Sequence, residues 1–364
     1  MLMFFREDRG SENREIGDKM SETEQGKTPS VSVVMVSFFT GPILEEAITA
    51  VLAQGDDVEL VLVNNGNEPV VEESLNARFA EHTHVRLLTG QGNIGFSRAC
   101  NLGARMAQGT RLLFLDPDCV LPPDTVKKLL SHETQVKRPF LFGARLQDER
   151  GKDHAYARQI LPTPRTMLVS FFHLSHLFPK VRLNYRQVPI PAEREVVPAI
   201  SSSFMYIYRD DYTRMGGLDE GYFLFGSALD FCIKFQRRNG KTYFLPDIVV
   251  KHIGSTSAVH SRFVARKKVL GMVRYYHEAF GMLYPQPLLW TVDALLWMKF
   301  LVRDVLLSRF KETDAYHKFA ATRQYAMVKT IVDKGVKQAS SGLIQAQEAA
   351  YSQMEKRRIQ KGGK

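Results

Sequence analysis

The sequence is poor in cysteine and has no long apolar run. Its 364 residues include three cysteines, each with apolar neighbours: Cys100, Cys119 and Cys232. So few cysteines exclude a disulfide framework, and without a Cys-x-x-Cys pair a zinc site is not expected, so we predict a reducing, cytosolic environment. No stretch of 18 residues is apolar, and the sequence therefore predicts no helix that spans a bilayer.

The N-terminal segment has almost no aliphatic side chains after its first five residues. The opening Met-Leu-Met-Phe-Phe is too short to be a signal peptide, and residues 6–30 are polar and charged. We therefore expect residues 1–30 to be a disordered leader. The whole chain, with 44% hydrophobic and 24% charged residues, has the composition of a folded globular protein.

Acidic residues are scarce in the last third of the chain. Residues 251–364 hold 20 Lys and Arg against 8 Asp and Glu, a balance of +12. This balance indicates an anionic partner surface, although a solvated helical face would explain it equally well. No recognition motif for nucleic acid accompanies the basic residues, so we expect no nucleic-acid partner. We place a boundary near residue 258 and expect residues 259–364 to be a basic, helical, membrane-associated region.

Apolar runs alternate with helical patterns between Val31 and residue 115. Strands are predicted at Val31–Val36, Val58–Val63, Val85–Leu88 and Arg111–Leu115, and helices at Ile43–Leu52 and Ser97–Ala107. Such alternation is typical of an α/β fold, a mostly parallel sheet covered by helices, which we expect over residues 31–258. Further along, we predict strands at Phe140–Ala144 and Phe204–Tyr208, a helix at Leu229–Asn239, and a closing pair of short strands at Thr242–Leu245 and Ile248–His252.

Ligands of open α/β sheets bind outside the carboxyl ends of the strands. The residues just past those ends are Ser37–Thr40, Asn64–Asn67 and Asp116–Asp118. Asp116 and Asp118 can present oxygens to one divalent cation, Mg²⁺ or Mn²⁺, and through it to a diphosphate. An isolated Asp-Pro-Asp is more often a plain turn, but its position after a buried strand favours a metal site here.

Two further segments, at His252 and at Gly216–Gly226, contain candidate ligand-binding residues. His252 ends a predicted strand before a small, hydroxyl-rich turn, so it could complete a metal site, meet a phosphate or be structural. The segment Gly216–Gly226 places Asp219 and Glu220 beside aromatic residues. Such a segment suits a wall that binds a sugar, and it could equally be a helix-capping loop.

Five motifs, taken together, resemble one family. They are VSVVMVSFFTGPILEEAITAVLAQ, VELVLVNNGN, GNIGFSRACNLGARMAQGTRLLFLDPDCVL, MGGLDEGYFLFGSALDFCIKFQRRNG and KHIGSTS. In this order the chain resembles family 2 glycosyltransferases, in particular the bacterial rhamnosyltransferase-like branch, over about residues 31–268. The resemblance implies a GT-A fold and inverting transfer of a sugar, rhamnose-like by preference, from a dTDP- or UDP-linked donor. It also implies an acceptor that is a cell-envelope polysaccharide or a lipid-linked oligosaccharide.

The resemblance also assigns roles to individual positions. The residues that match nucleotide-sugar-binding positions are Ser37, Phe38, Phe39, Asn64, Asn65, Asn93, Gly95, Asn101 and Asp116. Those that match the metal site are Asp116, Asp118 and His252, and those on the acceptor side are Ser202 and Ser203. The family usually has Asp where Asn64 stands, and Gly-Ala where the two serines stand.

The sequence departs from the family at the usual catalytic base. The family pattern Gly-Glu-Asp-x-Asp is here Gly-Ser-Ala-Leu-Asp, which puts Ala228 at the position of the base and keeps only Asp230. Three interpretations are open. The chain is an inactive or regulatory member, or an active enzyme that uses Asp230, Asp219 or Glu220, or a protein inactivated by a deliberate substitution at Ala228.

Other classes of protein explain less of the sequence. A nucleotidyltransferase would be expected to have a Gly-rich, basic phosphate loop after its first strand, and Ser37–Gly41 has none. A non-catalytic glycan- or membrane-binding protein would fit both Ala228 and the basic tail. On a helical wheel, Pro287–Leu307 has a partly separated apolar half, as in an interfacial helix or one packed on the catalytic domain. We expect a cytoplasmic protein, peripheral at the inner face of the cell membrane.

Overall fold

The computed structural model describes residues 29–172, 174, 177, 184–185, 188–254 and 261–302. The predicted leader, apart from its last two residues, and most of the basic C-terminal region lie outside these residues. The chain divides into two units, Met1–Phe300 and Leu301–Lys364. The architecture below is that of the first unit.

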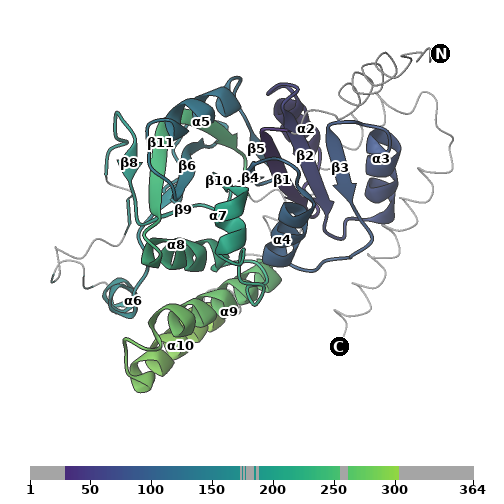
Figure 1. Cartoon of the computed structure of the whole chain (residues 1–364). Coiled ribbons are helices and arrows are strands. Elements are labelled where there is room, and N and C mark those ends of the chain that lie inside the picture. Colours follow the sequence, from purple (N-terminus) through teal and green to yellow (C-terminus); the bar gives the residue numbers. More distant parts are fainter. Residues whose placement is uncertain are drawn as a thin grey trace, which may run out of the picture. The chain divides into compact units, whose positions relative to one another are not determined.

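Four parallel strands form the first half of a large sheet (Figure 1). They lie in the order β3 (Val85–Leu88), β2 (Val58–Asn64), β1 (Val31–Ser37) and β4 (Arg111–Leu115). Every residue of β1 and β2 is buried, as expected for strands covered on both faces. The connecting helices are α2 (Ile43–Leu52), α3 (Pro69–Phe79) and α4 (Phe96–Met106). The α3 helix was not predicted, because its sequence has little amphipathic pattern.

The second half of the sheet is mixed. β10 (Phe204–Tyr208) runs antiparallel between β4 and β6 (Phe140–Gln147), and β11 (Lys241–His252) lies parallel to β6. Two short strands, β5 (Cys119–Val120) and β8 (Glu195–Val196), pair antiparallel with β11. The predicted pair of short closing strands is wrong, because Thr242–Leu245 and Ile248–His252 form one strand with a register shift between Leu245 and Val249. The predicted mostly parallel, helix-flanked sheet is confirmed.

Helices cover both faces of the sheet. On one face, Glu133 of α5 (Thr125–Glu133) binds Arg111 of β4 and Tyr206 of β10. On the other, Asn101 of α4 accepts a hydrogen bond from Tyr212 of α7 (Arg209–Arg214). The Tyr212 ring in turn contacts Phe231 of α8 (Ser227–Arg237), with ring centroids 5.5 Å apart. The small pair of β7 (Arg158–Gln159) and β9 (Ala199–Ile200) lies beside this sheet.

A second apolar cluster joins the last described helices to α8, which packs on the second half of the sheet. It unites α8 with α9 (Ser261–Phe280) and α10 (Gln286–Phe300), and α10 also packs on α6 (Pro164–Phe171). Its fully buried members include Tyr222, Tyr275, Leu289 and Val292. These contacts match the interpretation of α10 as a packed helix, although Trp290 stays 62% exposed. Within the described residues, no helix is long and apolar enough to cross a membrane.

The packing of α10 predicts a contrast between two adjacent residues. Leu289→Ala should lower the free energy of unfolding by about 2–4 kcal/mol, because a fully buried leucine leaves a cavity in the second cluster. Trp290→Ala, at an exposed position of the same helix, should cost less than about 1 kcal/mol. Urea unfolding of the two variants measures the difference. Equal losses would contradict the packed orientation of α10.

Candidate functional site

Three strands end side by side at one edge of the sheet. Strands β2, β1 and β4 are neighbours, and their register sets Ser37 opposite Asn64. Met35 of β1 pairs with Leu115, the last residue of β4, so Asp116 leaves the sheet beside the end of β1. The strand-end residues singled out from the sequence therefore share one edge, where parallel sheets bind ligands.

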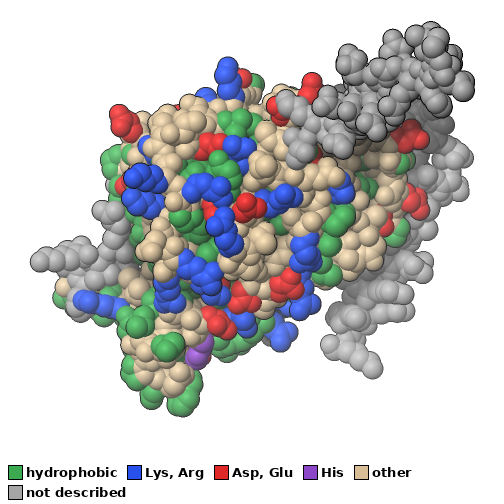
Figure 2. Space-filling view, viewed as in Figure 1, with side chains coloured by type: hydrophobic (Ala, Val, Ile, Leu, Met, Phe, Trp, Pro, Cys, Tyr) green, Lys and Arg blue, Asp and Glu red, His purple; other side chains and the backbone are tan. Residues whose placement is uncertain are grey.

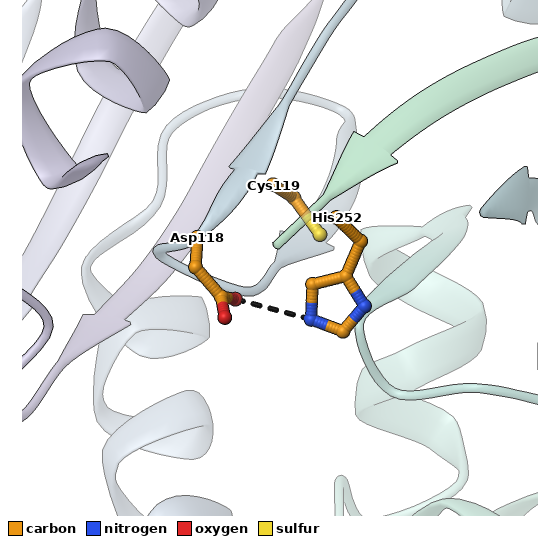
Figure 3. Close-up of side chains that lie close together, drawn as sticks. All are labelled: Asp118, Cys119 and His252. Carbon is orange, nitrogen blue, oxygen red and sulfur yellow. Dashed lines mark ion pairs between the residues drawn. The ribbon is translucent and has the colours of Figure 1, made fainter. Parts of the chain in front are cut away.

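Asp116 and Asp118, the acidic pair, lie close to a histidine from a strand that is distant in the sequence. The pairing of β5 with β11 sets Cys119 opposite His252. His252 Nε2 consequently lies 3.1 Å from Oδ1 of Asp118 and 3.9 Å from Oδ2 of Asp116. The side chains of Asp118 and His252 face each other, and the Cys119 sulfur lies near them (Figure 3). Asp118 and His252 are buried, whereas Asp116 keeps 24% of its side chain exposed.

This cluster favours a positive charge between its two carboxyl groups. Burial, together with the charge of Asp118, raises the pKa of Asp116 to about 6 against the opposing effect of His252. Burial lowers the pKa of His252, but the hydrogen bond to Asp118 and the charges of both carboxylates outweigh this, and the pKa of His252 is raised. A proton on the imidazole, or a bound cation, supplies the charge that the two carboxylates stabilise.

The donor atoms of the cluster fit a divalent cation. The ligand atoms of Asp118, Cys119 and His252 all lie within 4.8 Å of one another. Burial raises the pKa of the Cys119 thiol well above its ordinary value, and Sγ lies 3.6 Å from the carbonyl oxygen of Ser203, to which it donates. A thiol that stays protonated is a poor ligand, so carboxylate oxygens and an imidazole nitrogen are the suitable donors. This set suits Mg²⁺ or Mn²⁺. The metal-binding roles of Asp116, Asp118 and His252 stay predictions.

Two residues that sequence reasoning missed fix the histidine from behind. The Tyr156 hydroxyl lies 2.9 Å from Nδ1 of His252, and His154 Nε2 lies 2.9 Å from the His252 carbonyl oxygen. The rings of His154 and Tyr156 are stacked, with centroids 4.8 Å apart. Because the Tyr156 hydroxyl occupies Nδ1, Nε2 is the nitrogen that faces the acidic pair. No local motif marks these residues, since only the tertiary fold brings them to β11.

The serines predicted on the acceptor side lie directly behind the acidic pair. The carbonyl oxygen of Ser203 accepts a hydrogen bond from the Asp116 N–H at 3.0 Å. The Ser203 hydroxyl also bonds to that of Ser201 at 3.0 Å. Ser202 and Ser203 come just before β10, so this turn supports the turn of the acidic pair.

The loops after β1 and β2 are joined by amide side chains. Asn67 donates from Nδ2 to Oδ1 of Asn64 at 2.6 Å and accepts from the Phe39 N–H at 2.6 Å. Asn64 is 1% exposed and donates to Glu72 of α3, a partner that the sequence did not indicate. Asn64 therefore holds the shape of the loops, in which Phe38, Phe39 and Asn67 are partly buried.

The segment before α4 connects these loops to Gly216–Gly226, the acidic-aromatic segment that contains Asp219 and Glu220. Asn65 donates from Nδ2 to Oδ1 of Asn93 at 3.2 Å. Gly95 has a φ of 86°, and a Cβ there would lie 2.8 Å from the Phe223 carbonyl oxygen, so the position requires glycine. The same carbonyl accepts a hydrogen bond from the Phe96 N–H at 2.6 Å. The predicted residues Asn93 and Gly95 thus lie between the two segments.

Asn101 fastens α4 to the acidic-aromatic segment. Its Oδ1 accepts from the Leu218 N–H at 3.0 Å, and its Nδ2 donates to Oε1 of Glu220 at 3.1 Å. Glu220 also lies 3.6 Å from Arg98 and 3.7 Å from Arg105. Asn101 is buried, so in this structure it positions the segment that carries Glu220.

The other acidic candidates also have basic partners. Asp219 accepts from Arg274 of α9 at 2.9 Å and lies 3.7 Å from Lys234. Lys234 pairs more closely with Asp230, at 2.6 Å. Burial raises the pKa of Asp230, which is 1% exposed, and its Oδ1 has no hydrogen-bond partner among the described residues. Ala228 lies in the first turn of α8 and is buried.

The family assignment follows from comparison with known proteins. Residues 32–188 match the sequence model of Glycosyl transferase family 2. Over this segment the chain is similar to family 2 glycosyltransferases, which supports the predicted family. The rhamnosyltransferase WbbL of Escherichia coli (strain K12) is 25% identical to the chain over 146 residues, which are 39% of this chain and 52% of WbbL. The chain thus spans about half the length of this relative. The similarity over the matched residues supports the predicted rhamnosyltransferase-like branch.

A solved structure with a similar fold is that of GalNAc-T7 with UDP, GalNAc and Mn²⁺. It matches with a TM-score of 0.50 and 16% identity, over 82% of this chain and 58% of that one. This likeness concerns the fold, and the predicted GT-A fold is confirmed.

The acidic pair predicts metal-dependent nucleotide binding. Asp118→Asn should weaken binding of UDP or dTDP in Mn²⁺ by roughly tenfold or more, about 1.4 kcal/mol, because an amide is a weaker ligand than a carboxylate. The control Asp247→Asn changes an exposed carboxylate that pairs with His132 instead, and should leave the affinity unchanged. Calorimetric titration, with Mn²⁺ or with a chelator, measures both. Nucleotide affinity that is the same in chelator would contradict the metal site.

Proposed function

We propose that the chain is an inverting glycosyltransferase that moves a hexose, rhamnose-like by preference, from a dTDP- or UDP-linked donor. The proposed acceptor is a cell-envelope polysaccharide or a lipid-linked oligosaccharide. The observation that carries the proposal is the meeting of Asp116, Asp118 and His252 at the carboxyl edge of a family 2 glycosyltransferase sheet.

In this proposal, the donor lies across the ends of β2, β1 and β4. The nucleoside is held by the loops that contain Ser37–Phe39 and Asn64–Asn67, whose shape the amide network fixes. The segment from Asn93 to Gly95 closes the donor site toward Phe223. The diphosphate then points to Asp116 and Asp118, where a divalent cation, when bound, would neutralise the charge that develops on the leaving group.

The second chemical requirement is removal of a proton from the acceptor hydroxyl. That hydroxyl attacks the sugar from the face opposite the diphosphate, and a positioned carboxylate normally accepts its proton. The three acidic candidates, Asp219, Glu220 and Asp230, all have basic partners in this structure. These ion pairs favour the interpretation that Ala228 replaces the base and that the chain binds its donor but transfers slowly. A non-catalytic nucleotide-sugar-binding member at the membrane is the alternative.

Restoring a carboxylate at position 228 tests the function. Ala228→Asp should raise transfer by about a hundredfold, because the helix N-terminus keeps the new carboxylate ionised and ready to accept the proton. Ala228→Asn, of nearly the same shape but without a base, should not. A thermal-shift screen of dTDP- and UDP-sugars with Mg²⁺ or Mn²⁺ first identifies the donor, which raises the melting temperature whether or not it is turned over.

The outcomes of this experiment separate the alternatives. If the unaltered chain and both variants are equally and clearly active, another carboxylate is the catalytic base. Inactivity of all three with intact donor binding would favour the binding role. If no nucleotide sugar shifts the melting temperature, the proposed function is wrong.

We also propose that the chain associates with an anionic membrane surface through the α9–α10 hairpin. Its turn exposes Met282 completely and Leu283 to 68%, and Trp290 on α10 and Phe172 at the end of α6 are also exposed. Figure 2 shows hydrophobic side chains gathered at this end of the molecule, at the lower left. Four basic residues lie in the first two turns of α9, at the end of the helix away from the hairpin turn, and would add attraction to anionic lipid where the helix lies along the surface: Arg262, Arg266, Lys267 and Lys268.

Charge at the hairpin turn should disrupt this association. The double variant Met282→Asp, Leu283→Asp should bind vesicles of phosphatidylcholine and phosphatidylglycerol at least tenfold more weakly at low salt, because two buried apolar contacts with lipid are lost. The matched control is Val70→Asp, Val71→Asp on the exposed face of α3. Sedimentation with vesicles at low and high salt measures binding. An unaltered chain that does not sediment at low salt would end the proposal.

A further inference from the structure

A cavity of about 640 Å³ lies next to the candidate metal site. Its walls come from the end of β6, the turn that follows it, the segment His154–Arg158, and residues 185 and 188–190. The end of β6 pairs in parallel with the end of β11, where Arg145 is opposite Val249. The cavity therefore opens at the same edge of the sheet as the acidic pair, although neither carboxylate lines it.

A buried arginine holds one wall of this cavity in place. The Arg158 side chain is 4% exposed and donates to the carbonyl oxygens of Val188 and Pro189, both at 2.6 Å. It also pairs with Glu195 at 2.9 Å, and its guanidinium lies over the Tyr185 ring, 4.9 Å from the centroid. Burying a guanidinium is costly unless its donors are satisfied, and here they bind the cavity wall.

A second ion pair shapes the opposite side. Arg145 donates to both carboxylate oxygens of Asp153, at 2.6 and 3.0 Å, and Gln147 donates to the same carboxylate at 3.0 Å. Asp148 accepts from the backbone N–H of Lys152 and closes the turn between them. The two walls thus have fixed geometry.

Tyr156 lies between the cavity and His252 of the candidate metal site. Tyr156 lines the cavity and its hydroxyl contacts Nδ1 of His252, whose other nitrogen faces Asp118. Tyr156 and His252 therefore lie between a molecule in the cavity and the carboxylates at which a donor diphosphate is proposed to bind.

We propose that this cavity binds the acceptor saccharide, an inference that rests on the proposed function. Its volume is within the range of about 300–1,000 Å³ found for small-molecule sites. Tyr156, which is 38% exposed, offers aromatic surface to the C–H groups of a sugar, while Asp148, Lys152 and His154 offer both acceptors and donors to its hydroxyls. The mixture of positive and negative side chains in the lining argues against a phosphate group.

Filling the cavity tests this assignment. Ala155 lines the cavity, so the variant Ala155→Trp places a large side chain inside it. The control Ala80→Trp places the same side chain at the exposed end of α3. Saturation-transfer NMR with methyl glycosides of glucose, galactose, N-acetylglucosamine and rhamnose, in UDP and Mn²⁺, measures saccharide binding. We expect at least one glycoside to bind the unaltered chain and Ala80→Trp, and to bind Ala155→Trp at least tenfold more weakly. Lys152→Ala, which removes a donor without adding bulk, should weaken the same glycoside severalfold.

Nucleotide binding distinguishes failure of this inference from failure of the proposed function. Calorimetric affinity for UDP or dTDP should be the same for Ala155→Trp and the unaltered chain. A glycoside that binds Ala155→Trp and Lys152→Ala as well as it binds the unaltered chain would overturn the cavity assignment, and so would the absence of any glycoside binding. If the unaltered chain binds neither UDP nor dTDP, the proposed function is wrong.

Discussion

The pairing of β5 with β11 is the constraint on which the candidate site depends. Two residues of β5 follow the acidic pair almost immediately, and they bind the last two residues of β11, which sets Cys119 opposite His252. Without this short antiparallel contact, the imidazole would have no fixed position relative to Asp118. The hydroxyl of Tyr156 adds a second constraint from the other side of the ring. A histidine held at both nitrogens has one orientation, which a metal ligand requires.

The acidic residues near α8 show a competition between structure and chemistry. Asp219 and Asp230 share Lys234, and Asp219 also binds Arg274, so these side chains connect the acidic-aromatic segment to α8 and α9. A carboxylate held by cations is a weak proton acceptor, because the cations stabilise its ionised form. Burial acts to raise the pKa of Asp219, but the hydrogen bonds from the Gly221 N–H and Arg274 outweigh it, so the pKa is lowered and Asp219 is a poor base. The pKa of Asp230 is raised by burial in spite of Lys234.

The sequence predicted the half of the fold in which local pattern and burial agree. Strands such as β1 and β2 are apolar along their whole length, and the acidic pair follows a buried strand, so both could be identified from short segments. The contacts of His252 with Tyr156 and His154 could not, because these residues meet only through the pairing of distant strands. The continuous β11 was also missed, because Pro246 and Asp247 interrupt the apolar pattern where the strand has its register shift.

The antiparallel strand β10 explains how the proposed donor site and the proposed acceptor cavity can share one edge. It lies between β4, which ends at the acidic pair, and β6, which ends at the cavity. Because β10 runs in the opposite direction, its first residues, not its last, reach this edge, and the turn at Ser203 bonds to Asp116. Neighbouring strands are about 4.8 Å apart, so β4 and β6 run roughly 10 Å apart with β10 between them. The turn at Ser202 and Ser203, which the sequence predicted on the acceptor side, therefore precedes the strand between β4 and β6 and bonds to the first residue after β4.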